Sequence, residues 1–193
     1  MNTLKASWSS FDLKFIHPFT VAQFSRTTTP IVILKLELNG VVGYGEACMP
    51  PYLGESIESV FSFFEKVSFD VFRSDELESF LTEIDQIAGH NNAAKAAIDI
   101  ALHDVLSKTN NNCLTDYLNI PKGNKLSSYT IGIDTVDKMV DKTIEAKNAG
   151  FQVLKIKIGT DNDIELLKAI LRHWDKPFSV DVNQGWNNLE NAI

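Results

Sequence analysis

Cysteine is scarce in this 193-residue sequence, which contains only Cys48 and Cys113. Two cysteines cannot make the disulfide framework of a small secreted protein, so we expect a reducing, cytoplasmic environment. No run of eighteen apolar residues occurs, and the first eight residues lack the continuous apolar stretch of a signal peptide. These absences argue against secretion and against a membrane partner.

Positive charge is also in short supply. The sequence has 18 Lys and Arg against 25 Asp and Glu, a formal net charge of −7, and contains no basic run. A nucleic-acid-binding surface normally carries a basic patch, so we expect no nucleic-acid partner. The four histidines include no pair at metal-ligand spacing, and they give no reason to expect a zinc site.

The first part of the chain predicts strands. Residues 31–38 and 41–46 are rich in β-branched and apolar side chains, and Asn39-Gly40 between them is a strong hairpin signal. Residues from about 5 to 15 predict a third antiparallel strand. With hydrophobic residues at 44% of the chain, there is enough apolar material for a core.

Three amphipathic helices are predicted after these strands. Ser56 and Ser74 are candidate N-caps for the first two. The third begins near Asn92 and is rich in alanine, which lets a neighbouring backbone approach closely. The polar stretch 121–125 then indicates a boundary.

After this boundary, strands and helices alternate. The expected strands are residues 128–133, 153–158 and 178–182, and the expected helices are 136–148 and 163–174. Such alternation predicts parallel strands joined by right-handed crossovers. Doubly wound sheets and (β/α)₈ barrels both begin in this way, and the alternation does not choose between them.

Lys155 and Lys157 are the most informative residues of the chain. Side chains alternate between the two faces of a strand, so both lysines share one face, about 6.6 Å apart along the strand. A parallel strand covered by helices is normally apolar, so two ammonium groups fit best at its C-terminal end, where barrel active sites lie. Their repulsion, about 2.5 kcal/mol at an effective dielectric of about 20, favours loss of a proton from one lysine, as a general base requires. The alternative is a solvated strand end without a chemical role.

Asp181 and Asn183 form a second pair with the same spacing at the end of the next strand. Asp181 follows Lys157 by 24 residues, one strand–helix unit, so the two lie at equivalent C-terminal positions of consecutive strands. A carboxylate there is a natural ligand for Mg²⁺. Taken alone, an aspartate at a strand end is more simply explained as a helix N-cap.

Two further features carry less weight. Residues 43–48 resemble a dinucleotide-binding fingerprint, but the third glycine is missing and the segment lies in a predicted hairpin, so we expect no NAD. Arg26 is a lone arginine before a strand, for which a surface position is the simple alternative.

Seven short motifs, weak singly, occur together in a specific order and spacing. They are RTTTP at 26–30, GYGEA at 43–47, PPYLGES at 50–56, AKAAIDIALHD at 94–104, YTIGID at 129–134, KIK at 155–157 and DVNQGW at 181–186. In this order they resemble the muconate-lactonizing subgroup of the enolase superfamily, and within it the dipeptide epimerases. The resemblance runs over essentially all 193 residues.

The resemblance implies an α+β fold. Residues 1–122 would form an N-terminal capping domain with an antiparallel sheet plus helices. Residues 123–193 would form the first part of a (β/α)₈ barrel, truncated after the third barrel strand. The implied activity is Mg²⁺-dependent epimerisation of a dipeptide such as L-Ala-D/L-Glu, by α-proton abstraction through an enolate intermediate. Members of the superfamily are often oligomeric, so a homo-oligomer is compatible with the resemblance.

The resemblance also implies roles for individual residues. Lys157 matches the catalytic base on one face of the substrate, and Lys155 matches its electrostatic partner and a substrate-binding position. Asp181 matches the first of three carboxylate metal ligands, and Asn183 supports it. Arg26 and Thr130 match substrate-binding positions, Arg26 in a capping loop (residues 17–28) that closes over the site together with the loop at residues 49–56. In some Ala-Glu epimerases, an arginine in the first of these loops holds the acidic side chain of the substrate.

The chain departs from the family in length. A complete barrel needs on the order of 250 residues, and 71 residues follow Lys122. The other two metal ligands and the lysine of the opposite face are expected beyond Ile193, so we expect this chain alone to be inactive. The alternatives are a related activity, o-succinylbenzoate synthase or muconate cycloisomerase, and a non-catalytic fragment.

Overall fold

The computed structural model describes residues 3–121 and 123–186. The described residues form two compact units, one from Met1–Lys14 with Thr28–Lys122 and the other from Phe15–Thr27 with Gly123–Ile193. Residues 15–27 thus group with the second half of the chain, although they lie far from it in sequence. Within the described residues, no helix has the length and apolar character needed to cross a membrane.

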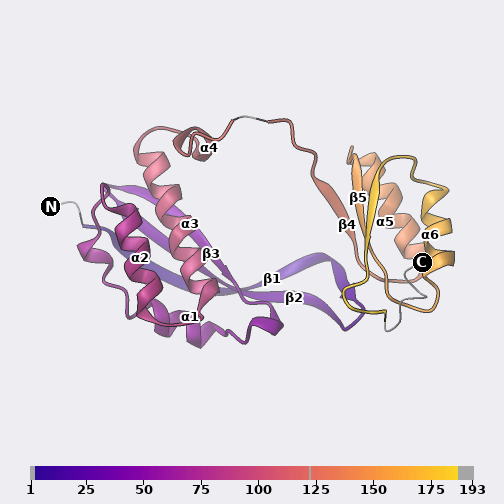
Figure 1. The fold of residues 1–193 in the computed structure, drawn as a ribbon, viewed down its shortest axis with the longest axis horizontal. Coiled ribbons are helices and arrows are strands. Elements are labelled where there is room, and N and C mark those ends of the chain that lie inside the picture. Colours follow the sequence, from indigo (N-terminus) through magenta and orange to yellow (C-terminus); the bar gives the residue numbers. More distant parts are fainter. Residues whose placement is uncertain (1–2, 122, 187–193) are drawn as a thin grey trace. The chain divides into compact units, whose positions relative to one another are not determined.

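The first unit is built on a three-stranded sheet (Figure 1). Its strands are β1 (Lys5–Val21), β2 (Phe24–Leu38) and β3 (Val41–Cys48), in the order β1-β2-β3. β2 and β3 pair antiparallel, and the turn between them is Asn39-Gly40, with φ of 54° and 80°. Asn and Gly adopt these left-handed conformations most readily, so the predicted hairpin is confirmed for a clear physical reason. β1 is longer than predicted and reaches Val21.

The helices of the first unit follow the sheet. They are the short 3₁₀ helices η1 (Pro51–Leu53) and η2 (Phe69–Val71) and the α-helices α1 (Ile57–Phe64), α2 (Leu77–Ile87), α3 (Asn92–Thr109) and α4 (Leu114–Tyr117).

One of the two predicted helix caps is confirmed. Ser56 caps α1: its hydroxyl accepts from the Ser59 N–H, and the Ser59 hydroxyl accepts from the Ser56 N–H. The prediction for Ser74 is wrong, because α2 begins only after Glu76. A turn closed by the Glu76 N–H on the Arg73 carbonyl, at 3.0 Å, occupies the predicted start of the helix.

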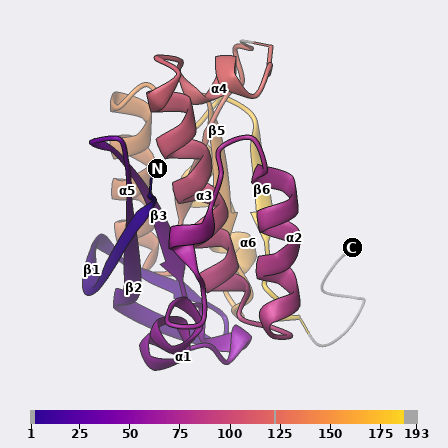
Figure 2. The same cartoon turned by 90° about the vertical axis from the view of Figure 1, so that its left-hand side faces the viewer.

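Helix α3 runs along β3 (Figure 2) at an unusually short distance. A Cβ atom on Gly43 would collide with the Val105 nitrogen, and one on Gly45 would collide with the Ala97 carbonyl oxygen. Glycines on the strand facing alanines on the helix therefore allow the close approach that the sequence predicted.

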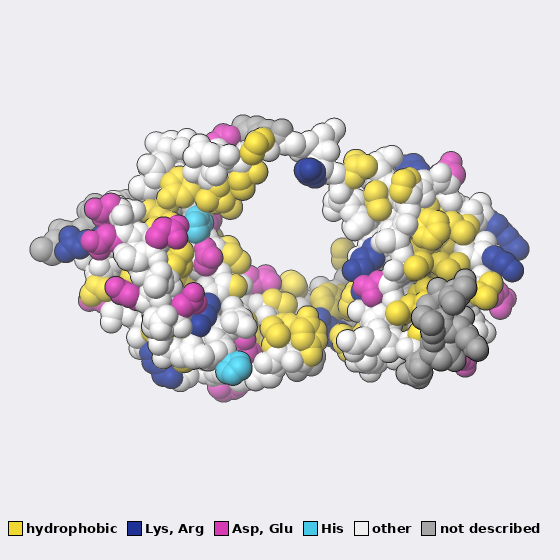
Figure 3. Space-filling model, in the orientation of Figure 1, with side chains coloured by type: hydrophobic (Ala, Val, Ile, Leu, Met, Phe, Trp, Pro, Cys, Tyr) yellow, Lys and Arg dark blue, Asp and Glu magenta, His cyan; other side chains and the backbone are white. Residues whose placement is uncertain are grey.

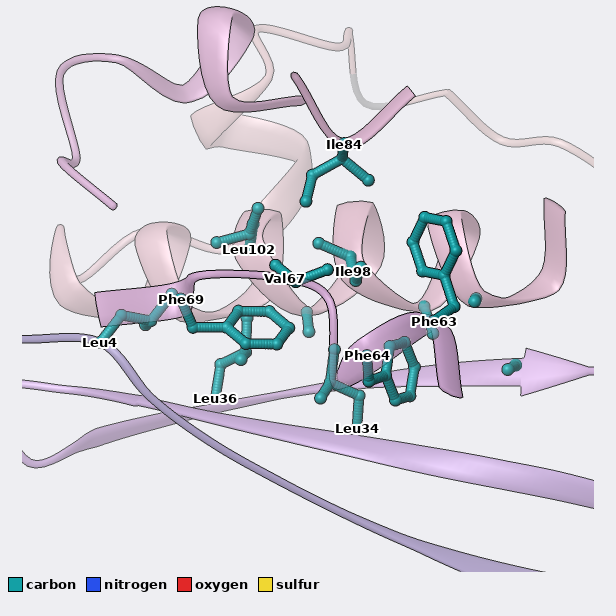
Figure 4. Packing of buried hydrophobic residues seen from close by; sticks show 14 of the residues in the cluster. Leu4, Leu34, Leu36, Phe63, Phe64, Val67, Phe69, Ile84, Ile98 and Leu102 are labelled. Atoms are coloured by element: carbon teal, nitrogen blue, oxygen red, sulfur yellow. The ribbon is translucent and has the colours of Figure 1, made fainter. Parts of the chain in front are cut away.

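The core of the first unit lies between the sheet and these helices. In Figure 4, Leu34 and Leu36 from β2 lie opposite Ile98 and Leu102 from α3, with Phe64 of α1 beside them. All five are at most 2% exposed.

The second unit contains a parallel sheet. Its elements are β4 (Ser128–Ile131), α5 (Val136–Asn148), β5 (Val153–Lys157), α6 (Asp163–Leu171) and β6 (Phe178–Asp181), with strand order β4-β5-β6. The predicted alternation of strands and helices is confirmed, with boundaries that differ by a few residues.

The two faces of this sheet differ in character. Ile131, Leu154 and Ile156 face the helices and are fully buried with Met139 and Ile170. The side chains of alternate positions therefore point to the opposite face, which is free to carry polar groups.

Charges of both signs are mixed on one face of the molecule (Figure 3). On the face that Figure 3 shows, acidic and basic side chains of the described residues are interspersed, without a broad basic area. This distribution agrees with the excess of acidic residues in the sequence.

Candidate active site

Lys155, Lys157 and Asp181 lie on one face of the parallel sheet. β4, β5 and β6 are in register, with Thr130 beside Lys155 and Lys157 beside Asp181. Residues paired in this way point to the same side of a sheet. The predicted position of Lys157 and Asp181 at equivalent ends of consecutive strands is therefore confirmed.

Asp181 joins the two lysines. Its Oδ2 lies 2.9 Å from Lys155 Nζ and 2.8 Å from Lys157 Nζ, and its Oδ1 accepts the Asn183 N–H at 2.9 Å. Hydrogen bonds from Lys157, then from Lys155 and the Asn183 backbone, hold the pKa of the Asp181 carboxyl well below its usual range. The shared anion offsets the repulsion between the two ammonium groups that the sequence predicted.

Lys157 is the more firmly held of the two lysines. Its side chain is 7% exposed, against 40% for Lys155. Besides Asp181, it donates to the Asn183 Oδ1 at 2.7 Å. Burial with two acceptors fixes the Lys157 Nζ at the C-terminal end of β5, whereas Lys155 keeps contact with solvent.

The loop after β6 presents its oxygen atoms through an unusual backbone. Asn183 and Gln184 have φ of 45° and 63°, in the left-handed region. This conformation is uncommon for residues other than glycine, although Asn tolerates it better than most. It turns the chain directly after β6, and Asn183 hydrogen-bonds both Asp181 and Lys157.

The oxygen atoms at this strand end suit a hard cation. Asp181 offers a carboxylate and Asn183 an amide oxygen, the ligand types that Mg²⁺ prefers. Within residues 3–121 and 123–186, no group of three or more His, Cys, Asp or Glu side chains is placed to hold a metal. The described residues thus fit Mg²⁺ in chemistry and supply one carboxylate toward it.

Arg26 and Thr130 line a separate cavity of about 390 Å³ in the second unit. The Arg26 guanidinium lies over the rings of Phe15 and Phe24, at 5.6 and 5.5 Å. Arg26 is half-buried, so the simple surface position does not apply. Thr130 connects this cavity to the lysine face through its register with Lys155, but Lys155, Lys157 and Asp181 are not among its lining residues.

A larger cavity of about 980 Å³ lies over α6. Its lining includes Asp163, Lys168 and Trp186, but neither Lys157 nor Asp181. Lys157 and Asp181 therefore lie outside this cavity as well.

Sequence reasoning missed one buried acid near the site. Asp163, which is 8% exposed, accepts hydrogen bonds from Gly159, Thr160 and Trp186. The sequence offered only a general signal: acidic residues are enriched in the first turn of a helix, and Asp163 is the first residue of α6. Its contact with Trp186 joins two loops and could not be predicted from local spacing.

Comparison with known proteins tests the predicted family. Residues 9–118 match the N-terminal domain of the mandelate racemase / muconate lactonizing enzyme family. The chain belongs to this family. The chain thus contains the N-terminal capping domain of the family, with an antiparallel three-stranded sheet plus helices, and its coverage of about half of its relatives is consistent with a truncated barrel portion.

The curated relatives are epimerases. The L-Ala-D/L-Glu epimerase of Bacteroides thetaiotaomicron is 44% identical over 192 residues, which cover 98% of this chain and 50% of the relative. The L-Ala-D/L-amino acid epimerase of Flavobacterium johnsoniae is 30% identical, covering 95% of this chain and 54% of the relative. The chain spans about half the length of the curated relatives it matches.

Solved structures of dipeptide epimerases agree with these relatives. A dipeptide epimerase from Enterococcus faecalis, complexed with Mg and L-Leu-L-Tyr, has a TM-score of 0.87 at 29% identity, covering 96% of this chain and 55% of its own. The substrate-liganded L-Ala-D/L-Glu epimerase from Bacillus subtilis has a TM-score of 0.85 at 27% identity, covering 96% and 55%.

Proposed function

We propose that this chain is part of a dipeptide epimerase and provides the proton-transfer lysine for one face of the substrate. The observation that carries the proposal is the contact of Lys157, Asp181 and Asn183 at the C-terminal ends of β5 and β6. Active sites of (β/α) barrels lie at this end of the strands. The names of the curated relatives support the same reaction class.

Lys157 is assigned the role of acid and base. Its Nζ is held in one place by Asp181 and Asn183, as a group that removes and returns a proton must be. The neutral amine takes the α-proton from one epimer, and in the opposite direction of the reaction the ammonium form gives a proton to that same face. The acid or base of the opposite face comes from outside this chain. Lys155 is assigned an electrostatic role, because it shares the Asp181 carboxylate and is open to solvent on the same face.

Asp181 and Asn183 are the residues that would hold Mg²⁺ here. When bound, the ion supplies positive charge that stabilises the negative charge developing on the substrate carboxylate. Magnesium in the solved complexes of related epimerases supports this assignment.

The substrate class follows from Arg26. A half-buried guanidinium beside two aromatic rings, in a cavity that also contains Thr130, suits a carboxylate. We therefore assign the acidic side chain of an Ala-Glu dipeptide to this cavity. The 44% identical relative, named for L-Ala-D/L-Glu, supports the choice.

The test uses the complete native gene product that carries this chain. We expect it to convert L-Ala-L-Glu to L-Ala-D-Glu, measured by chiral chromatography. Replacing Arg26 with Gln should lower kcat/KM for L-Ala-L-Glu by about tenfold or more, because a charge-assisted contact is lost, and should change L-Ala-L-Leu much less. Arg73→Gln, at an arginine that is 71% exposed, is the matched control and should leave both values unchanged.

Three results would contradict the proposal. Turnover of muconate or of a succinylbenzoate precursor, without any epimerisation of dipeptides, would assign the protein to a related activity. An equal loss for both dipeptides in the Arg26 variant would remove Arg26 from substrate selection. Inversion needs an acid and a base on opposite faces of one carbon, and this chain is proposed to supply only one of them. Clear epimerisation by residues 1–193 alone would therefore contradict the proposal that this chain is only part of the active enzyme.

A further inference from the structure

The tip of the β1–β2 hairpin packs on three glycines of the second unit. These glycines, Gly132, Gly159 and Gly185, each follow one of the parallel strands and are here called the glycine platform. The hairpin tip is the two-residue turn Ala22-Gln23 with its flanking residues. The tip therefore reaches the loops after all three strands that form the candidate site.

The fit between Ala22 and the glycine platform is close. A Cβ on Gly159 would lie 3.2 Å from the Ala22 Cβ, and one on Gly185 would lie 2.8 Å from it. Gly159 also has φ of +122°, which side chains rarely adopt. The space beside Ala22 exists only because both positions are glycine.

Two further contacts hold the hairpin. The Ile133 N–H donates to the Thr20 carbonyl at 2.9 Å, beside Gly132. His17 Nε2 lies 2.9 Å from Glu145 Oε2 on α5. The hairpin that carries Arg26 is thus attached to the second unit at its tip and along its side.

Asp163 hydrogen-bonds to the loops that carry Gly159 and Gly185 of the glycine platform. Its carboxylate accepts from the N–H of Gly159 at 3.0 Å, the N–H of Thr160 at 2.9 Å and the Thr160 hydroxyl at 2.9 Å. Its Oδ2 also accepts from the Trp186 indole at 2.9 Å. One buried carboxylate therefore ties the loop after β5 to the loop after β6.

These two loops are direct extensions of the candidate site. Gly159 lies two residues after Lys157, and Gly185 lies two residues after Asn183. The proposed mechanism gives Asp163 no chemical step, and a buried acid that accepts from four neutral donor groups calls for a reason of its own.

We infer that Asp163 is a positioning residue: by joining the loops after β5 and β6, it forms the surface that seats Ala22 and so fixes the Arg26 hairpin relative to Lys157. This inference rests on the proposed function, because the consequence it names is substrate binding. Its structural part, the dependence of the hairpin on Asp163, can be tested without any activity.

The structural arm measures amide hydrogen exchange by NMR on the complete native gene product. Replacing Asp163 with Asn removes the charge and one acceptor, so exchange at Thr160 and Ile133 should accelerate by at least about tenfold. Asp161→Asn, an exposed aspartate of the same loop, is the matched control and should change neither amide. Unchanged exchange at Ile133 in the Asp163 variant would overturn the inference.

A second variant keeps the test decisive if the Asp163 variant fails to fold. Ala22 is an exposed turn residue whose Cβ lies against Gly159 and Gly185. In Ala22→Leu the larger side chain crowds both glycines, so Ile133 exchange should accelerate while Thr160, still bound to Asp163, stays protected. Gln23→Leu adds similar bulk at the neighbouring exposed turn position and should leave Ile133 protected. Protection of Ile133 in the Ala22 variant would show that the tip is not held by the glycine platform.

The functional arm uses the complete native gene product with L-Ala-L-Glu. Asp163→Asn should raise KM by about tenfold and lower kcat by less than about threefold, since the lysine and its acceptors remain. A loss of kcat alone, or kinetics equal to those of Asp161→Asn, would overturn the functional part. If the unmodified protein epimerises no dipeptide, the proposed function fails, and the exchange measurements still decide the role of Asp163.

Discussion

Asp181 is the residue on which the proposed chemistry depends most directly. Its carboxylate contacts both lysines and the backbone of Asn183, and its pKa is held low by those hydrogen bonds, so it is an anion throughout the neutral range. An anion at this position can form ion pairs with Lys155 and Lys157 and can also be a ligand for a cation. In the proposed mechanism, the same carboxylate links proton transfer to metal binding.

Replacing Asp181 with Asn should weaken Mg²⁺ binding to the complete native gene product. We expect at least about a tenfold rise in the dissociation constant, because a charged oxygen ligand becomes neutral. Isothermal titration calorimetry with MgCl₂ measures the change. Asp175→Asn, an aspartate with a 78% exposed side chain, serves as the control, and equal affinity in both variants would remove Asp181 from the metal site.

Asp163 should make the stability of the second unit depend on pH. Burial raises the pKa of its carboxyl, but hydrogen bonds from Thr160, Trp186 and Gly159 outweigh burial and hold that pKa below the usual range. Because the folded-state pKa is depressed, the stabilisation is fully present above the unfolded-chain pKa of about 3.9. It is lost as the pH falls through the folded pKa.

Asp163→Asn should therefore destabilise the second unit by about 2 kcal/mol at pH 7. The difference from the unmodified chain should be nearly unchanged at pH 5 and should shrink when urea unfolding is repeated at pH 4 and 3. A difference that stays constant with pH would mean that the carboxylate charge contributes nothing to the fold. Asp161→Asn controls for the loss of one negative charge in the same loop.

At the scale of elements, the contact between β3 and α3 holds the first unit together. Gly43 and Gly45 face the alanine-rich side of α3 so closely that no side chain fits. At the open edge of β3, Asp104 of α3 accepts the Tyr44 N–H at 2.8 Å, and Lys108 donates to the Val42 carbonyl at 3.3 Å. Side chains of α3 thus satisfy backbone groups of an edge strand that would otherwise face solvent.

Gly45→Ala should destabilise the first unit by about 1–3 kcal/mol, because the added methyl overlaps the Ala97 carbonyl. Gly89→Ala is the matched control: nothing lies within 4 Å of a Cβ at that position, and its effect should stay within about 0.5 kcal/mol. Urea denaturation followed by circular dichroism measures both. Equal effects at the two glycines would show that α3 can move away from the sheet without cost.

Elements defined by local pattern were predictable, and those defined by distant contacts were not. Asn39-Gly40 and Ser56 act through neighbours in sequence, so their turn and cap could be predicted. β1 was predicted too short: its last residues, from Phe15 on, belong to the second unit, and their contacts with residues distant in sequence could not be predicted from local pattern. The cap at Ser74 failed because a turn at Arg73–Glu76 competes with it.

At the scale of the whole molecule, the candidate site could be predicted in part because a parallel sheet has a simple period. The side-chain period of two residues places Lys155 and Lys157 on one face, and a strand–helix unit of 24 residues brings Lys157 beside Asp181. No such period connects residues 15–27 to the loops after β5 and β6. The association of Ala22, Asp163 and Trp186 is a property of the folded chain and was not predictable from spacing.

The central claim is that Lys157 moves the α-proton of a dipeptide, and deuterium exchange tests it most directly. The complete native gene product is incubated with L-Ala-L-Glu in D₂O, and deuterium at the glutamate α-carbon is followed by NMR. Lys157→Met should lower the exchange that this lysine serves by a factor on the order of 10²–10⁴, while Lys66→Met, at an exposed lysine of the first unit, should leave it unchanged. Deuterium entering at the same rate with and without Lys157 would contradict the account.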